Sequence, residues 1–198
     1  MGSVAAVNEF EVKPLDIDTW TAFADLVVRN GGVWGGCWCL GFHPEGGSVR
    51  GFDARRDAKL QRVREGTTHN ALVFDGDVCL GWCQFGSPEE LTRIKFGKVY
   101  KSVPSELPDW RITCFYVDKK GRHRGVADAA LAGALQMIAE LGGGRVESSP
   151  EDVTGRKVSN SFLYNATTSI FERHGFTRVR QLGKNNWLVS ADVAPSRA

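Results

Sequence analysis

Residues 111–141 read RITCFYVDKKGRHRGVADAALAGALQMIAEL, and this stretch decides the fold. The apolar run from Arg111 to Val117 predicts a buried strand, and Val126 to Leu141 has the apolar period of a helix that Gly142 to Gly144 terminate. The residues expected on the inner face of this helix are Leu131, Ala134, Leu135 and Ile138. A strand, a turn and a helix in this order predict a crossover unit of a mixed α/β protein.

The turn between the strand and the helix concentrates positive charge. A helix N-terminus offers unpaired amides and a positive dipole, and Gly125 lets the backbone approach an anion closely. Lys120, Arg122 and Arg124 add charge, each worth about 0.3–1 kcal/mol near a helix start. The turn therefore predicts a pyrophosphate cradle, although it matches neither the dinucleotide nor the P-loop fingerprint. A solvated basic turn before a helix is the alternative interpretation.

Further strands and helices surround this unit. Strands are expected at Glu9–Leu15, Asn70–Phe74, Val78–Phe85, Arg145–Ser148 and Trp187–Val189. Helices are expected at Thr19–Arg29, Asp53–Glu65 and Ser169–Arg173. In the second of these helices, Leu60 and Val63 are expected to face inward. The predicted fold class is α/β (α+β), with a mixed, mostly antiparallel central sheet and flanking helices.

Two connections in this pattern carry their own signals. The Asp75-Gly76-Asp77 turn between apolar runs predicts a β-hairpin, and Gly183 predicts a second one near the end of the chain. Residues 86–109 form a long, proline-punctuated connection, in which we expect a short helical turn near Glu89 and Glu90. Long loops in compact domains are often functional or mobile.

Composition limits the classes of function. The chain has 198 residues, of which 42% are hydrophobic and 24% charged, as is typical of one ordinary soluble domain. The formal net charge of +2 does not indicate a nucleic-acid or membrane partner. Five cysteines without a signal peptide predict reduced thiols in a cytoplasmic protein. We expect an N-terminal arm at 1–8, one domain at 9–190 and a disordered tail at 191–198.

Two motifs carry a family resemblance. Arg122-His123-Arg124-Gly125-Val126-Ala127 resembles the R/Q-x-x-G-x-G/A signature of the GNAT superfamily of acetyltransferases. Phe171-Glu172-Arg173-His174-Gly175-Phe176 resembles the later Y-E-x-x-G-F element of that family. The resemblance extends roughly from Asn8 to Val189, and both motifs occur in order on the expected strand–helix background. A Cys-Trp-Cys loop at Cys37–Cys39 and a Gly-Trp-Cys-Gln strand at Gly81–Gln84 resemble one subgroup.

The resemblance implies a splayed sheet that holds acetyl-coenzyme A in its gap. It also implies that an amine attacks the thioester directly in a ternary complex, helped by proximity, carbonyl polarisation and proton transfer. The acceptor expected is a primary amine of a small molecule, and the chain is expected to be a monomer or a homodimer. The residues that the resemblance assigns to the cofactor are Phe115, Tyr116 and Val117 for pantetheine, and Arg122, His123, Arg124, Gly125, Val126 and Ala127 for the pyrophosphate.

The catalytic groups depart from the family pattern. Many members place a proton-donating tyrosine where this chain has Phe171, which cannot donate a proton. Tyr164 is a candidate replacement, although a packing or surface role is the preferred interpretation, with water protonating the thiolate. Glu147 is the first candidate for the base, because a partly buried carboxylate can have a raised pKa. Its alternative role is a surface salt bridge. From the sequence, Tyr164→Phe should therefore cost little and Glu147→Gln more.

The loop after the first helix is the most unusual stretch. In the family this loop lines the acceptor site, so the residues expected there are Trp34, Trp38, Phe42 and His43, with aromatic filling beneath a loop as the alternative. Cys37, Cys39 and Cys83 invite a metal interpretation, but C-x-C is not the spacing of structural zinc sites, and no metal is expected. Two other classes stay open. They are a catalytically degenerate sensor or scaffold that binds acyl-coenzyme A, and a thiol or metal protein.

Overall fold

A seven-stranded sheet forms the centre of the protein. The computed structural model describes residues 10–159 and 163–196, and its strands follow the order β1-β2-β3-β4-β5-β7-β6. Strands β4 and β5 are parallel, and every other neighbouring pair is antiparallel. The mixed, mostly antiparallel sheet expected from the sequence is thus confirmed.

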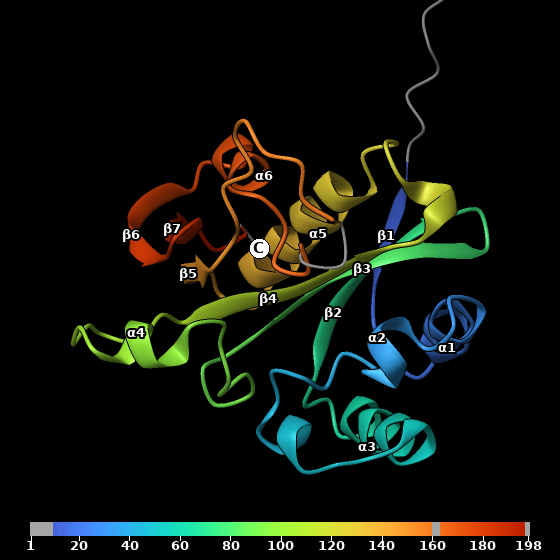
Figure 1. The fold of residues 1–198 in the computed structure, drawn as a ribbon. Coiled ribbons are helices and arrows are strands. Elements are labelled where there is room, and N and C mark those ends of the chain that lie inside the picture. Colours follow the sequence, from blue (N-terminus) through green and yellow to red (C-terminus); the bar gives the residue numbers. More distant parts are fainter. Residues whose placement is uncertain (1–9, 160–162, 197–198) are drawn as a thin grey trace, which may run out of the picture.

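Helices cover both faces of this sheet. The strands are β1 (Glu11–Pro14), β2 (His69–Asp75), β3 (Val78–Gly86), β4 (Trp110–Val117), β5 (Gly144–Ser148), β6 (Thr177–Gly183) and β7 (Asn186–Val193). The helices are α1 (Trp20–Arg29), α2 (Val33–Gly36), α3 (Phe52–Arg64), α4 (Gly97–Lys101), α5 (Val126–Glu140) and α6 (Thr168–Arg173), with 3₁₀ turns η1 (Pro44–Gly47) and η2 (Lys119–Gly121). Helices α5 and α6 lie on one face, and α1 to α3 lie on the other (Figure 1).

The sheet splays in its middle. Strand β5 pairs with β4 only over the segment from Trp110 to Ile112. It then ends at Ser148, whereas β4 continues to Val117. One edge of β4 is therefore left without a neighbouring strand beyond Ile112, which opens the sheet on the side where α5 begins.

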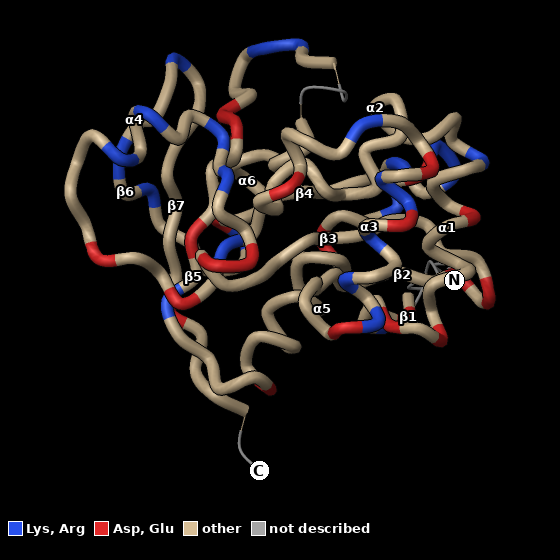
Figure 2. The backbone as a smooth tube through the Cα atoms, turned by 90° about the horizontal axis from the view of Figure 1, so that it is seen from below, with Lys and Arg blue, Asp and Glu red and all other residues tan. Residues whose placement is uncertain are grey.

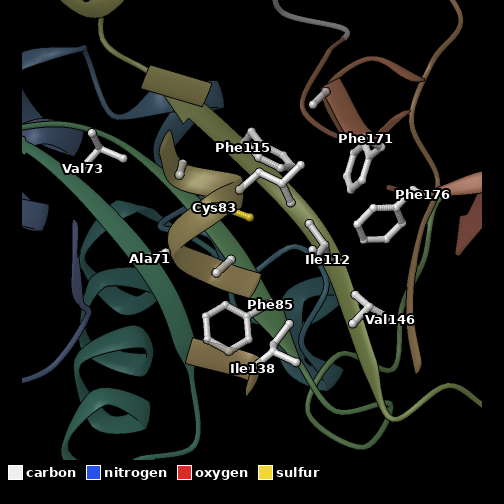
Figure 3. Packing of buried hydrophobic residues seen from close by; sticks show 14 of the residues in the cluster. Ala71, Val73, Cys83, Phe85, Ile112, Phe115, Ile138, Val146, Phe171 and Phe176 are labelled. Atoms are coloured by element: carbon white, nitrogen blue, oxygen red, sulfur yellow. The ribbon is translucent and has the colours of Figure 1, made fainter. Parts of the chain in front are cut away.

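Two apolar cores lie on the two faces of the sheet. One packs α5 and α6 against the sheet and contains Cys83, Phe115 and Phe171 (Figure 3). The other packs α1 and the Cys-Trp-Cys loop against the opposite face and contains Trp38, Trp82 and Cys114. Successive residues of a strand point to opposite faces, and for this reason Cys114 and Phe115 belong to different cores.

The structure departs from the expected elements in three places. Helix α3 buries Lys59 together with Val63, while Leu60 is only partly buried, because polar groups under the helix accept hydrogen bonds from the lysine. In the long connection, residues 88–90 form the turn expected near Glu89 and Glu90, with the Leu91 amide donating to the Ser87 carbonyl at 2.9 Å, whereas α4 further along was not expected. Strand β7 extends to Val193, into the expected tail. The arm at 1–8 and the last two residues lie outside the described residues.

Charged residues of both signs are spread along the described part of the chain. Lysine and arginine alternate with aspartate and glutamate along the backbone, without a segment of a single sign dominating the view (Figure 2). Within residues 10–159 and 163–196, no helix combines the length and the apolar character needed to cross a membrane.

Candidate functional site

A cleft of about 480 Å³ opens where β4 leaves β5. The edge of β4 from Phe115 to Val117 and the start of α5 form one wall. Residues of the segment 163–170 and the side chain of Trp34 form the other. The cleft therefore joins an unpaired strand edge to a helix N-terminus.

The turn before α5 exposes amides to this cleft. The first intrahelical bond of α5 runs from the Ala129 amide to the Gly125 carbonyl, so the amides of Val126, Ala127 and Asp128 have no partner within the helix. Gly125 has φ of 84°, and a Cβ placed there would meet no atom within 4 Å. The left-handed backbone turns the helix start toward the cleft and leaves it uncovered. The arrangement can bind an anionic group of an elongated ligand.

The structure brings together eight of the nine cofactor residues assigned from the sequence. The residues that line the cleft are Phe115, Tyr116, Val117, Arg122, His123, Gly125, Val126 and Ala127. The ninth, Arg124, points elsewhere. Its guanidinium pairs with Asp75 at 2.7 Å and lies 5.3 Å from the centre of the Phe10 ring. Arg124 therefore ties the turn to the β2–β3 hairpin.

Tyr164 lies beside the cleft, next in the chain to Leu163, which lines it. Its carbonyl accepts a 2.6 Å hydrogen bond from the amide of Phe115 on the open edge of β4. Its ring meets Trp34 and Phe42, with centroid distances of 6.0 and 6.1 Å. Burial raises the pKa of the Tyr164 hydroxyl, and the neighbouring Cys114 and a nearby carboxylate add to the shift. The hydroxyl therefore stays protonated at neutral pH.

Glu147 is held by neighbouring side chains. Its Oε2 accepts a 2.7 Å hydrogen bond from the Tyr100 hydroxyl, and its Oε1 lies 3.9 Å from the Arg145 guanidinium. The cavity beside these groups measures only about 20 Å³, too small for an amine substrate. The carboxylate thus ties β5 to α4 rather than lining the 480 Å³ cleft.

The acceptor residues expected from the loop separate into two groups. Trp34 is 42% exposed at the cleft, and Phe42 packs beside Tyr164. Trp38 and His43 are in the core, with exposed fractions of 1% and 0%. Trp38 stacks on Trp20 and contacts Phe23 and Phe52. It therefore fills the core beneath the loop, which is the alternative role given for these residues from the sequence.

Phe171 is also a core residue. It packs edge-on against Phe115 and Phe176, with centroid distances of 5.9 and 5.0 Å (Figure 3). It is fully buried and belongs to the core that α5 covers. The ring therefore supports the strand beneath the cleft and contributes no polar group to it.

His43 is a neutral core histidine. Its Nε2 accepts hydrogen bonds from the Gln84 amide at 2.9 Å and from the Thr68 hydroxyl at 3.3 Å. Burial and the positive charges of Lys59 and Arg62 lower the pKa of His43 to about 2. His43 therefore fixes the loop to β2 and β3 and cannot act as a base at the cleft.

Acid should destabilise the protein through His43. The His43 imidazole binds a proton near pH 6.5 in the unfolded chain, but only near pH 2 in the folded chain. The contribution of His43 to the unfolding free energy is therefore complete above pH 6.5 and decreases as the pH falls. We expect this group to remove about 1.4 kcal/mol of unfolding free energy per pH unit between pH 6 and 4. Urea unfolding at several pH values across this range measures this loss. In His43→Gln, the unfolding free energy should fall with decreasing pH less steeply than in the wild type, by about 1.4 kcal/mol per pH unit. Parallel slopes would contradict the expectation.

Two residues near the cleft were missed by the sequence analysis. The ammonium of Lys95 lies 4.8 Å from the Tyr164 ring centre and 3.7 Å from the Glu151 carboxylate, and burial lowers its pKa. Asn165 is buried, and its Oδ1 has no hydrogen-bond partner among the described residues. Both lie in long connections, where no period or motif marks a residue as inward-facing.

The cysteines do not form a metal site in the part of the chain that the structure describes. There, no group of three His, Cys, Asp or Glu side chains is placed to hold a metal ion. Cys83 belongs to the core under α5 and Cys39 to the core under α1, so the sheet separates them.

Comparisons with known proteins identify the fold. No protein-family model and no curated protein sequence matches the chain. A protein described as an acetyltransferase of the GNAT family, from Desulfovibrio desulfuricans, superposes with a TM-score of 0.54 at 15% identity, covering 94% of this chain and 100% of that one. The PaiA N-acetyltransferase of Thermoplasma acidophilum, in complex with coenzyme A, gives 0.52 at 11% identity, covering 93% and 99%. The protein yncA of Salmonella typhimurium, with its cofactor acetyl-coenzyme A, gives 0.54 at 12% identity, covering 96% and 98%.

Proposed function

We propose that this chain, which has the GNAT acetyltransferase fold, transfers acetyl from acetyl-coenzyme A to a primary amine of a small molecule. The observation that carries the proposal is the 480 Å³ cleft, which joins the open edge of β4 to the N-terminus of α5. Two proteins of the same fold were solved with coenzyme A and acetyl-coenzyme A, which supports the same ligand here.

The residues of the cleft fit the parts of this ligand. The unpaired amides at the start of α5, together with Arg122, offer positive potential to a pyrophosphate. The amide of Phe115 is already bonded to Tyr164. Val117, two residues further along, presents its N–H and C=O groups to the same open edge and can pair with the amide-containing arm of the ligand. Acetyl-coenzyme A supplies the activated acyl group when bound.

For proton transfer, we propose Tyr164 as the acid, in place of the water preferred from the sequence. Tyr164 is bonded through its carbonyl to Phe115, which lines the cleft, and its hydroxyl stays protonated because burial raises its pKa. A positioned hydroxyl can donate a proton to a leaving thiolate. Glu147 already accepts a hydrogen bond from Tyr100 and lies outside the cleft. In this proposal Tyr164 is the acid, and Glu147 stabilises the packing of α4.

Trp34 and Tyr116 give the cleft an aromatic lining, and Tyr164 and Phe42 lie behind it. Trp34 contacts both Tyr116 and Tyr164 edge-on, at centroid distances of 5.8 and 6.0 Å, and Phe42 packs against Tyr164. Such walls bury the apolar part of a small molecule, while a few polar groups fix its orientation. The proposal therefore favours a small amine that carries an apolar or aromatic portion.

Ligand binding gives the direct test of this function. At a concentration of 100 Kd, acetyl-coenzyme A should stabilise the folded chain by about 2.7 kcal/mol by mass action. For a domain of this size, that corresponds to a rise in Tm of about 5–10 °C. Differential scanning fluorimetry and calorimetry measure the binding, and mass spectrometry of amine pools measures the gain of acetyl groups. Binding without turnover across a broad panel would identify a sensor, and no binding would refute the proposal.

A further inference from the structure

A second cavity lies along the half of helix α5 that is remote from the cleft. It measures about 390 Å³, and it shares no lining residue with the 480 Å³ cleft. The cleft uses the start of α5, whereas this cavity uses its later part, from Gly133 onward. The apolar residues that line it are Val12, Pro14, Leu15, Phe85, Met137 and Leu141. A cavity of this volume and apolar lining is typical of a site for a small molecule.

One histidine of the second cavity has a fixed tautomer. The His69 ring shares a face of the sheet with Phe85, its partner across β2 and β3, and Phe85 lies beside α5 (Figure 3). Glu90 accepts hydrogen bonds from His69 Nδ1 at 2.6 Å and from the His69 backbone amide at 3.1 Å. A carboxylate only accepts, so in the neutral ring the proton lies on Nδ1 and Nε2 keeps a lone pair. The side chain is 32% exposed, and no hydrogen bond among the described residues involves Nε2.

The Glu90 carboxylate that orients this ring is itself held in place. Its side chain is only 9% exposed, and His69 is its one ion-pair partner among the described residues. The Glu90 amide donates to Ser87 Oγ at 3.3 Å. Gly86 leaves room for the carboxylate, because a Cβ at that position would lie 2.6 Å from Glu90 Cδ. The ring of His69 is therefore fixed, with Nε2 left free as an acceptor.

Acceptors also prevail at the end of α5. Gln136 Nε2 donates to Glu140 Oε1 at 3.0 Å, which leaves the Gln136 carbonyl and the second Glu140 oxygen as acceptors at the cavity. Glu140 is the last residue of α5, where the helix dipole favours a positive charge. No lysine or arginine occurs among the described residues that line the cavity. The nearby Lys59 ammonium donates to the side chains of Thr68 and Asn70 under α3, on the opposite face of the sheet.

We propose that the second cavity binds a small ammonium ion with an apolar body, an arylalkylamine in its protonated form. An ammonium carries three N–H donors and no acceptor, which matches the lone pair of His69 Nε2 and the carboxylate of Glu140. The apolar body would pack against Phe85 and the adaptable side chain of Met137. A carboxylate ligand would meet the charge of Glu140 without a lysine or arginine to pair with. This site does not depend on the proposed acetyl transfer.

NMR spectra of the imidazole nitrogens can locate the ligand. The chain has four histidines, of which His69 lines the second cavity and His123 lines the cleft. The full-length protein is titrated with 2-phenylethylamine at pH 8, where an alkylamine is still protonated and a neutral ring keeps Nε2 as an acceptor. We expect a saturable shift of the His69 Nε2 resonance, with a Kd of about 1 mM or tighter. No shift at His69, or a shift at His123 alone, would overturn the proposal.

A second titration separates this site from the proposed cofactor site. Coenzyme A should shift the resonances of His123 and leave those of His69 unchanged, because the two cavities share no lining residue. A missing response to coenzyme A would count against the proposed acetyl transfer alone. A missing response of His69 to 2-phenylethylamine would count against the second site alone.

An uncharged ligand of the same shape tests the chemical class. 2-Phenylethanol keeps the apolar body of the amine but lacks its charge, and 3-phenylpropionate carries a negative charge instead. We expect 2-phenylethanol to bind at least ~5-fold more weakly than 2-phenylethylamine, and 3-phenylpropionate more weakly still. Equal affinities for the alcohol and the amine would refute the ammonium assignment.

Glu140→Gln tests the carboxylate at the end of α5. Isothermal titration should show the affinity for 2-phenylethylamine about 3-fold lower, because an exposed charge at a helix C-terminus contributes modestly. The matched control is Glu65→Gln, since Gln61 Nε2 donates to Glu65 at 2.6 Å in the same spacing at the end of α3, outside the cavity. Glu65→Gln should bind as the wild type does. Equal affinities of the two variants would show that Glu140 does not contact the ligand.

His69→Phe tests the ring nitrogen. The phenyl ring can keep the packing against Phe85 and Trp110, but it removes the acceptor at Nε2. We expect the affinity for 2-phenylethylamine to fall at least ~10-fold, while the affinity for 2-phenylethanol changes less. Thermal unfolding verifies that the variant is folded, and the Glu140→Gln comparison tests the site if it is not. Unchanged amine affinity in folded His69→Phe would overturn the proposal.

Discussion

Gly125→Glu is expected to weaken the binding of coenzyme A about 100-fold while the chain stays folded. Gly125 is the residue before the first turn of α5, at φ of 84°, with open space where a side chain would project. A glutamate there would project toward the helix amides proposed to hold the pyrophosphate, and its charge would repel the anion. The left-handed backbone would add a cost of about 1–2 kcal/mol to folding.

A matched variant separates the loss of binding from backbone strain. Gly66 also has a left-handed backbone, with φ of 65°, and open space around its Cβ position, but it lies at the end of α3, outside the cleft. Gly66→Glu therefore carries the same charge and a similar strain. Isothermal titration with coenzyme A should show wild-type affinity for Gly66→Glu and a large loss for Gly125→Glu. Equal affinities would mean that the pyrophosphate binds elsewhere.

Tyr164→Phe is expected to reduce kcat about 100-fold, the loss typical of removing a positioned acid. The substitution removes only the hydroxyl, so the ring contacts with Trp34 and Phe42 and the backbone bond to Phe115 are kept. The affinity for coenzyme A should therefore stay within a few-fold of wild type. Because burial raises the pKa of Tyr164, the wild-type alkaline limb that this residue governs should lie above the ordinary tyrosine range.

Glu147→Gln is the matched comparison for this prediction. A glutamine can still accept the hydrogen bond from Tyr100, so its kcat/KM should change less than threefold, by roughly 0.6 kcal/mol. Profiles of kcat/KM against pH for both variants, with an acceptor found by the amine screen, decide between the two residues. If Glu147→Gln lost the acid limb and Tyr164→Phe kept full activity, the assignment preferred from the sequence would be restored.

The strand–turn–helix unit could be predicted because its determinants are contiguous. The apolar strand, the glycine before the helix and the period of the helix all lie within residues 111–141. Backbone conformation at Gly125 is a local property, and so is the set of amides at a helix start. For this reason eight of the nine residues assigned to the cofactor from the sequence line the cleft.

Side chains brought together from distant segments could not be placed in this way. Arg124 turned to Asp75 on a neighbouring hairpin, and Glu147 met Tyr100 on α4, 47 residues earlier. Tyr164 reached the open edge of β4 because β5 ends early and leaves that edge unpaired. These contacts depend on strand order and on the lengths of the connections, which local patterns do not encode.

The sequence by itself determined the strand and helix order, the mixed sheet and the glycine turn that leaves amides free at the start of α5, because hydrophobic period and glycine conformation act over a few residues. The tertiary structure alone decided which side of α3 is buried. Lys59 faces the core there because Thr68, just before β2, and Asn70, on β2, place oxygen acceptors beneath it. A buried charge is tolerated only where partners from several segments converge, and that convergence exists only in the folded chain.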